Sequence, residues 1–143
     1  MRRDSRLAEF IAEVRTWIGT PFRHAGREKG IGVDCGGVWI CALRDSGVFD
    51  YAKLNYGPFI DPSYVVTRIL EPCHFVPPKE RRPGDILLFN IHGIAQHTGV
   101  LVSETTFVHG YQSAGKVCET DLEPVFIRSL VAVFRIKEDL WPR

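Results

Sequence analysis

Cys35 stands where the sequence predicts the start of a buried helix. It lies in the run Asp34-Cys35-Gly36-Gly37, and the apolar residues 38–43 follow. A thiol at a helix N-terminus is close to unpaired backbone N–H groups and to the positive end of the helix dipole, which favour the thiolate. The position therefore predicts a lowered pKa and a nucleophilic sulfur. A cysteine that packs as a small apolar side chain is the alternative.

Two histidines in the second half of the chain offer a base and a partner for that base. If residues 97–102 and 106–109 form a hairpin centred on Ser103, His97 lies directly opposite His109 on the same face of the sheet. Directly opposed side chains have Cβ atoms about 4.5–5.5 Å apart, and a slip of one residue would put the rings on opposite faces. Cysteine with assembled histidines is the arrangement for nucleophilic acyl transfer. The alternative for each ring is a hydrogen-bonded polar residue at a sheet surface.

The four cysteines and five histidines raise the question of a metal site. None of them has the short spacing of structural zinc modules, and the single pair separated by four residues, His92 and His97, spans Gly93 in a predicted loop. We expect neither a metal nor another cofactor.

Length and charge indicate one domain over residues 1–143. The chain carries 18 basic and 17 acidic side chains, scattered instead of clustered, which argues against a nucleic-acid partner or a polybasic membrane contact. The N-terminus shows no signal peptide and no stretch apolar enough to span a membrane. We therefore expect a protein that is cytoplasmic as synthesised, with free thiols.

Hydrophobic spacing places helices first and strands afterwards. The first helix is predicted from an N-cap at Asp4 or Ser5 to a stop at Gly19, and further helices over 35–45 and 64–70. Strands are predicted over 86–91, 97–102, 106–111, 117–122 and 129–136. This order indicates an α+β fold in which the second helix packs on an antiparallel sheet.

Five segments, in order, resemble the NlpC-type cell-wall cysteine peptidases. They are GTPFRHAG at 19–26, VDCGG at 33–37, RPGDILLF at 82–89, QHTGV at 96–100 and FVH at 107–109. The resemblance covers nearly the whole chain and implies a papain-like fold, with the nucleophile at a helix N-terminus packed on the sheet. The short form is most similar to phage-encoded members associated with tail assembly.

The resemblance assigns the nucleophile to Cys35, the general base to His97 and the residue that orients the base to His109. It implies hydrolysis of peptidoglycan stem peptides, typically at the bond between D-γ-glutamyl and a diamino acid. Backbone N–H groups at the helix start would stabilise the oxyanion.

Three positions are candidates for substrate binding. In the family the acidic residue before the cysteine helps to bind the substrate's amino group, which makes Asp34 a candidate, with a helix N-cap as the alternative. Gly36 stands where the family usually has Ser, and Phe22 where it often has Tyr. The two missing hydroxyl groups bear on specificity more than on the chemistry.

Three functions remain open from the sequence. The first is a cell-wall peptidase, and the second is a phage tail-assembly component with little or no hydrolase activity, against which an intact Cys35 and His97 argue. The third is a related thiol amidase or acyltransferase, but the sequence shows no apolar insertion for a lipid substrate. The expected partners are stem peptides and a phage tail protein, which would place the protein in a virion tail or deliver it to the wall.

Overall fold

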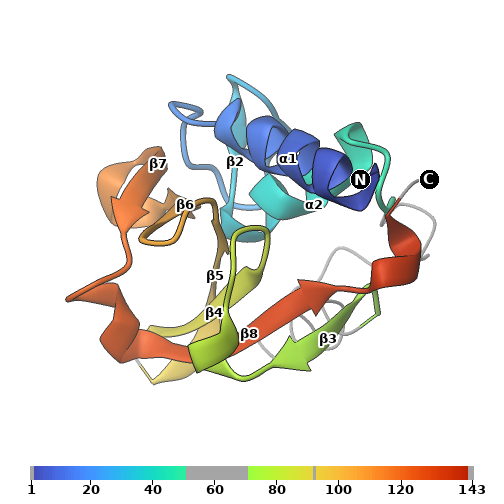
Figure 1. The fold of residues 1–143 in the computed structure, drawn as a ribbon. Coiled ribbons are helices and arrows are strands. Elements are labelled where there is room, and N and C mark those ends of the chain that lie inside the picture. Colours follow the sequence, from blue (N-terminus) through green and yellow to red (C-terminus); the bar gives the residue numbers. More distant parts are fainter. Residues whose placement is uncertain (1, 51–70, 92, 142–143) are drawn as a thin grey trace.

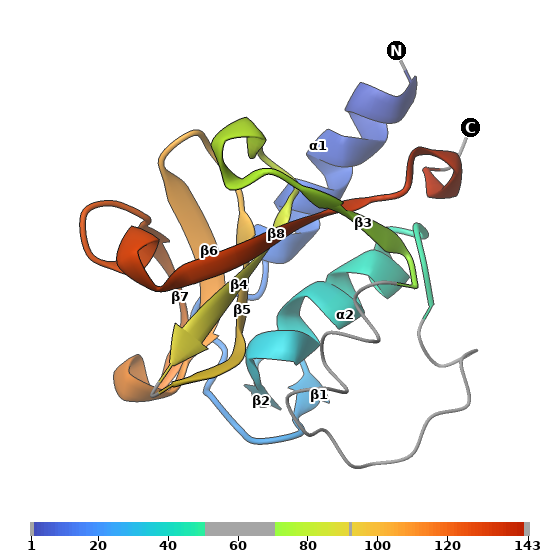
Figure 2. The same cartoon turned by 90° about the horizontal axis from the view of Figure 1, so that it is seen from below.

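The computed structural model describes residues 2–50, 71–91 and 93–141. Two helices, α1 (Arg2–Arg15) and α2 (Cys35–Asp45), lie together above the strands in Figure 1. A short hairpin of β1 (Arg27–Glu28) and β2 (Gly32–Val33) precedes α2, and α2 begins beside it (Figure 2). Neither helix of these described ranges is long and apolar enough to cross a membrane.

The other described strands form one antiparallel sheet in the order β3-β8-β4-β5-β6-β7. Their bounds are β3 Cys73–Val76, β4 Ile86–Ile91, β5 Ile94–Leu101, β6 Thr106–Tyr111, β7 Lys116–Asp121 and β8 Leu130–Ile136. Short 3-10 turns cover 78–80, 112–114, 126–129 and 138–140. Helix α2 packs on the central strands β5 and β6, and α1 packs on α2. The α+β prediction is therefore confirmed.

Apolar side chains cover both faces of the sheet. One buried cluster joins the helices to the sheet and includes Phe10, Trp17 and Trp39. The second cluster fills the opposite face, where its buried members are Val76, Leu87, Phe89, Leu101, Phe107, Leu122 and Val133. Because alternate residues of a strand point to opposite faces, the central strands contribute to both clusters.

The second helix has the predicted bounds, but the first does not. Helix α1 begins at Arg2, so Asp4 lies in its first turn and the predicted N-cap at Asp4 or Ser5 is wrong. An acidic residue in the first turn interacts favourably with the helix dipole without being the N-cap. After α1 ends at Arg15, the chain forms a tight turn in which the Trp17 N–H donates to Val14 O at 3.1 Å. This turn still buries Trp17.

Two strands, 86–91 and 106–111, have the predicted bounds, and the ends of the others differ by up to three residues. Strand β3 was not predicted, because four residues between Pro72 and Pro77 give too little alternation to recognise. The helix predicted over 64–70 lies outside the described residues.

The register of the β5–β6 hairpin differs from the prediction. The ladder centres the turn on Glu104 instead of Ser103, and the Ser103 hydroxyl accepts the Thr106 N–H at 2.9 Å within this turn. Moving the centre by one residue shifts the pairing by two, so the prediction that His97 lies directly opposite His109 is wrong. A shift of two keeps both rings on one face, and they become diagonal neighbours within reach of each other.

We predict opposite effects on stability for the adjacent glycines of the first turn of α2. A Cβ at Gly37 would lie 2.6 Å from Val33 Cγ2 and 2.9 Å from Gly26 O, whereas one at Gly36 would have its nearest neighbours at 3.9 Å. Replacing a helical glycine by alanine normally stabilises by roughly 0.5–1 kcal/mol. We expect Gly36→Ala to keep or raise the free energy of unfolding in urea, and Gly37→Ala to lower it by about 1–3 kcal/mol. Equal effects of the two substitutions would contradict this packing.

Candidate active site

One buried carboxylate organises the start of α2. Asp34 is the N-cap, and its Oδ1 accepts the Gly37 N–H at 2.7 Å. The same oxygen accepts a hydrogen bond from Arg27 Nη1 at 2.7 Å, and Oδ2 accepts the Ala25 N–H at 2.9 Å. Ala25 has a left-handed backbone with φ of 61°, which is unfavourable for a residue with a Cβ. Asp34 therefore joins the helix, β1 and the strained loop before it.

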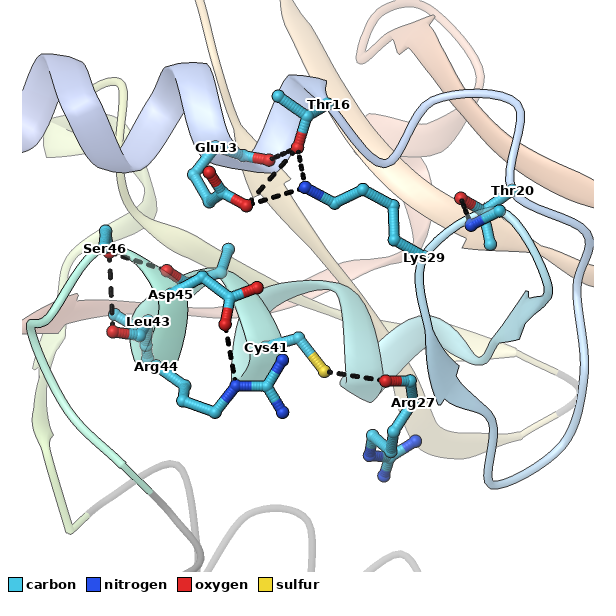
Figure 3. A network of polar contacts seen from close by, with 12 residues as sticks. Glu13, Thr16, Thr20, Arg27, Lys29, Cys41, Leu43, Arg44, Asp45 and Ser46 are labelled. Atoms are coloured by element: carbon cyan, nitrogen blue, oxygen red, sulfur yellow. Dashed lines mark hydrogen bonds and ion pairs between the residues drawn. The ribbon is translucent and has the colours of Figure 1, made fainter.

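The segment that contains Arg27 and Lys29 and leads to α2 also contacts both α1 and α2, as Figure 3 shows. Lys29 Nζ lies 2.8 Å from Glu13 Oε1 and donates to Thr16 Oγ1 at 2.6 Å, at the end of α1. On α2, the Cys41 thiol donates to Arg27 O at 3.8 Å. These contacts fix the chain that precedes the candidate nucleophile.

Cys35 is the first residue of α2, and its sulfur lies against the backbone of β5. The thiol donates to Gln96 O at 3.9 Å, and Thr98 is among the neighbours that favour its thiolate form. Gln96 precedes His97, so the sulfur lies beside the middle of the strand that carries the candidate base. On the other side, Gly110 of β6 approaches so closely that a Cβ there would lie 3.2 Å from Cys35 N.

A buried tryptophan orients the Thr98 hydroxyl. The Trp39 Nε1–H, one helical turn after Cys35, donates to Thr98 Oγ1 at 2.9 Å. Both side chains are buried. The hydroxyl oxygen accepts from the indole, so its own hydrogen stays available for another acceptor.

Burial raises the pKa of the Cys35 thiol, and the neighbouring Asp34 carboxylate adds to this rise. The hydrogen bonds from Thr98, and one from the Gly36 backbone, act in the opposite direction but are outweighed. The expectation of a lowered pKa is therefore wrong in direction. Removal of water from the sulfur and the adjacent negative charge matter more here than the helix N-terminus.

His97 and His109 are joined by a short hydrogen bond. His97 Nε2 lies 2.8 Å from His109 Nδ1, with the two rings inclined at 68°. Burial lowers the pKa of His97 to about 4, and burial together with the neighbouring His97 lowers the pKa of His109 to about 3. Both rings are therefore neutral at pH 7. His97 Nδ1, which this bond leaves unused, is the nitrogen that remains for the thiol.

Aromatic rings enclose His109, which is fully buried. Tyr111 stacks on it at 4.8 Å, and Phe107 and Phe126 lie 4.3 Å and 5.3 Å from it, centre to centre. Its second nitrogen, Nε2, lies 3.0 Å from Thr120 Oγ1 on β7. The ring is thus held by a hydrogen bond at each nitrogen.

The structure places the Cys35 sulfur against Gln96, the residue before His97, and joins His97 to His109. The catalytic roles of these three residues stay a prediction. Asp34 has the capping role that the sequence offered as the alternative, and its carboxylate already accepts three hydrogen bonds. Gly36 is half-buried in the first turn of α2. Phe22 donates its N–H to Gly115 O at 2.9 Å. Substrate binding by these three residues stays a prediction.

Sequence reasoning missed three residues of the site: Thr98, Trp39 and Thr120. Their types are ordinary for strands and buried helices, and only the register of β5, β6 and β7 brings them to the catalytic side chains. The alternation around His97 could have pointed to Thr98, because a polar residue between buried positions of a central strand requires a partner.

A model of the NlpC/P60 family matches residues 19–135. No curated protein sequence matches the chain. Among solved structures, the chain is similar to the peptidoglycan hydrolase RipB from Mycobacterium tuberculosis, with a TM-score of 0.70 and 19% identity over 94% of this chain and 67% of that chain.

Two other structures show the same fold. An NLP/P60-family protein similar to a lipoprotein, from Staphylococcus aureus, has a TM-score of 0.68 and 17% identity over 93% of this chain. The present chain spans 42% of that protein. The NlpC/P60 domain of the peptidoglycan hydrolase SagA has a TM-score of 0.66 and 18% identity over 92% of this chain and 97% of that chain. The expected papain-like arrangement is thereby confirmed.

We predict that Cys35 has an apparent pKa above the value of about 8.5 for an unperturbed thiol, because burial and the Asp34 carboxylate disfavour its thiolate; alkylation by iodoacetamide reports this pKa. Peptide mapping across a pH series measures this for each cysteine. Cys73 should stay unmodified, because burial raises its pKa to about 12. Thr98→Val should raise the pKa of Cys35 further, whereas Thr98→Ser should not. A Cys35 pKa below 7 would contradict the geometry.

Proposed function

Because the chain belongs to the NlpC/P60 family, we propose that it is a cysteine endopeptidase that hydrolyses peptidoglycan stem peptides. The bond between D-γ-glutamyl and a diamino acid is the proposed site of cleavage. The observation that carries the proposal is the 2.8 Å hydrogen bond between His97 and His109. His97 lies on β5, the strand against which the Cys35 sulfur lies. A nucleophile, a base and a group that orients the base are what this chemistry requires.

The reaction starts from a neutral thiol and a neutral imidazole. His97 Nδ1 takes the proton of the Cys35 thiol while the sulfur attacks the carbonyl carbon of the scissile bond. Since both groups resist charge in this buried setting, the transfer occurs together with the attack, when the negative charge moves to the substrate oxygen. His97 becomes cationic and keeps its Nε2–H on His109.

The start of α2 stabilises the oxygen that becomes negative. The first N–H groups of a helix have no partner within it, and Asp34 takes that of Gly37. The N–H group of Cys35 remains for the oxyanion. His97 then gives its proton to the leaving amine as the C–N bond breaks. Water, activated by the same ring, hydrolyses the thioester and restores the thiol.

The similarity to RipB and SagA supports the choice of substrate, since both are peptidoglycan hydrolases. Their identity to this chain is below 20%, so the substrate rests on the family and on the retained side chains. A tail-assembly component that keeps the fold without the activity is the competing function, and it requires no thiol-dependent cleavage.

We predict that the purified protein cleaves soluble muropeptides at the D-γ-glutamyl bond, and that Cys35→Ala does not. Mass spectrometry of the products identifies the bond. Cys41→Ala is a matched control, because Cys41 is a buried residue of the same helix whose thiol faces Arg27 O. If the wild-type protein leaves a panel of muropeptides intact while Cys35→Ala still supports assembly of infectious phage particles, the structural function replaces the enzymatic one.

The two histidines should act as one unit in that assay. We expect His97→Ala to lower kcat by about 10²–10⁴, as for a lost general base. His109→Gln should be milder, because an amide oxygen can still accept the hydrogen bond from His97 Nε2–H. The double substitution should cost far less than the product of the single losses. Losses that multiply would show that the hydrogen bond between the rings has no role in turnover.

A further inference from the structure

We propose that Thr120 is a positioning residue that fixes the protonation pattern of the two histidines by accepting a hydrogen bond from His109. The inference rests on the proposed function, since it assigns His97 as the base. Its basis is a continuous path of hydrogen bonds from β5 across β6 to β7. His97 Nε2 is 2.8 Å from His109 Nδ1, and His109 Nε2 is 3.0 Å from Thr120 Oγ1.

A neutral imidazole carries one N–H, so the path permits two arrangements. In the productive one, His97 Nε2–H donates to His109 Nδ1, and His109 Nε2–H donates to the Thr120 oxygen. In the reversed one, the Thr120 hydroxyl donates to His109 Nε2, and His109 Nδ1–H donates to His97. The proton of His97 then sits on Nδ1. A ring protonated there cannot accept the proton of the Cys35 thiol.

The hydroxyl of Thr120 has a second partner that suits the productive arrangement. Its oxygen lies 3.6 Å from Cys118 Sγ, two residues earlier on the same strand. A hydroxyl that gives its hydrogen to this sulfur keeps its lone pairs for the His109 N–H. When His97 becomes cationic during catalysis, both of its nitrogens carry hydrogen, so only the productive arrangement is then compatible with the bond to His109.

The surroundings of His109 make this hydroxyl important. Phe107, Tyr111 and Phe126 surround the ring with aromatic faces and edges. A buried N–H that loses its partner pays its full desolvation cost. Thr120 itself is half-buried, so a smaller side chain would admit water to His109 Nε2, whereas an isosteric apolar one would not.

This difference gives an experiment that separates hydrogen bonding from packing. We expect kcat/KM on muropeptides to stay within about twofold in Thr120→Ser and to fall about three- to tenfold in Thr120→Val, the loss of one hydrogen bond. Thr120→Ala should lie between, because water can replace the hydroxyl. A packing role gives a different order, with Thr120→Val the most active and Thr120→Ala the least. That order would overturn the proposal.

A second measurement reads the protons directly. Nitrogen-15 spectra of the histidine rings in the labelled full chain should show His109 protonated at Nε2 and His97 at Nε2 in the wild type, with the pattern weakened in Thr120→Val. Thr106→Val is the matched control, because Thr106 donates to Glu119 at 2.8 Å on the neighbouring strand and does not contact His109. His109 protonated at Nδ1 in the wild type would overturn the proposal.

The two measurements separate this inference from the proposed function. If no muropeptide is cleaved but His109 carries its proton on Nε2 and loses that preference in Thr120→Val, the function fails and the role of Thr120 stands. If muropeptides are cleaved and Thr120→Val leaves both kcat/KM and the spectra unchanged, the function stands and the role of Thr120 fails.

Discussion

The buried carboxylate of Asp34 is the constraint on which the rest of the site depends. It caps the helix that carries the nucleophile, and it holds Arg27 and the left-handed Ala25 on the preceding segment. Capping alone contributes about 1 kcal/mol, but here the same group also sets where the chain enters α2. Its negative charge is unfavourable for a thiolate at Cys35, the next residue. The geometry of the nucleophile is thus secured by a group that opposes its ionisation.

Burial is the largest cause of the pKa shifts in the site, although the side chains of Cys35 and His97 keep some exposure to solvent. Removal of water raises the pKa of Cys35 and lowers those of His97 and His109, so the three groups rest in neutral forms. Hydrogen bonds at the sulfur and between the rings are what remains to orient them. In such surroundings a fixed donor or acceptor interacts more strongly than it does in water. The site is prepared for reaction by the orientation of its protons, and not by a preformed thiolate–imidazolium ion pair.

Sequence reasoning identified the elements that carry the strongest local signals. The sequence of helix α2 has an N-cap, a cysteine and a continuous apolar run, and the bounds of this helix were predicted correctly. The hairpin register depends on a turn that the Ser103 hydroxyl closes, and no hydrophobic pattern reports that hydrogen bond. The error of two residues kept His97 and His109 on one face, so the pairing of the rings survived. The pKa of Cys35 could not be predicted, because burial at a helix start depends on how closely β5 approaches.

The segment at 19–22 lies along the outer edge of β7. Val117 exchanges hydrogen bonds of 2.9 Å with Gly19 and Thr20, and Phe22 donates to Gly115 O. The same segment continues into the loop that Asp34 holds. The strand of Thr120 and the helix of Cys35 are therefore tied by one stretch of chain, and a local opening there would release both. In the terms of hydrogen exchange we expect them to open as one cooperative unit, so that detachment of this stretch would disrupt the candidate active site while most of the sheet stays folded.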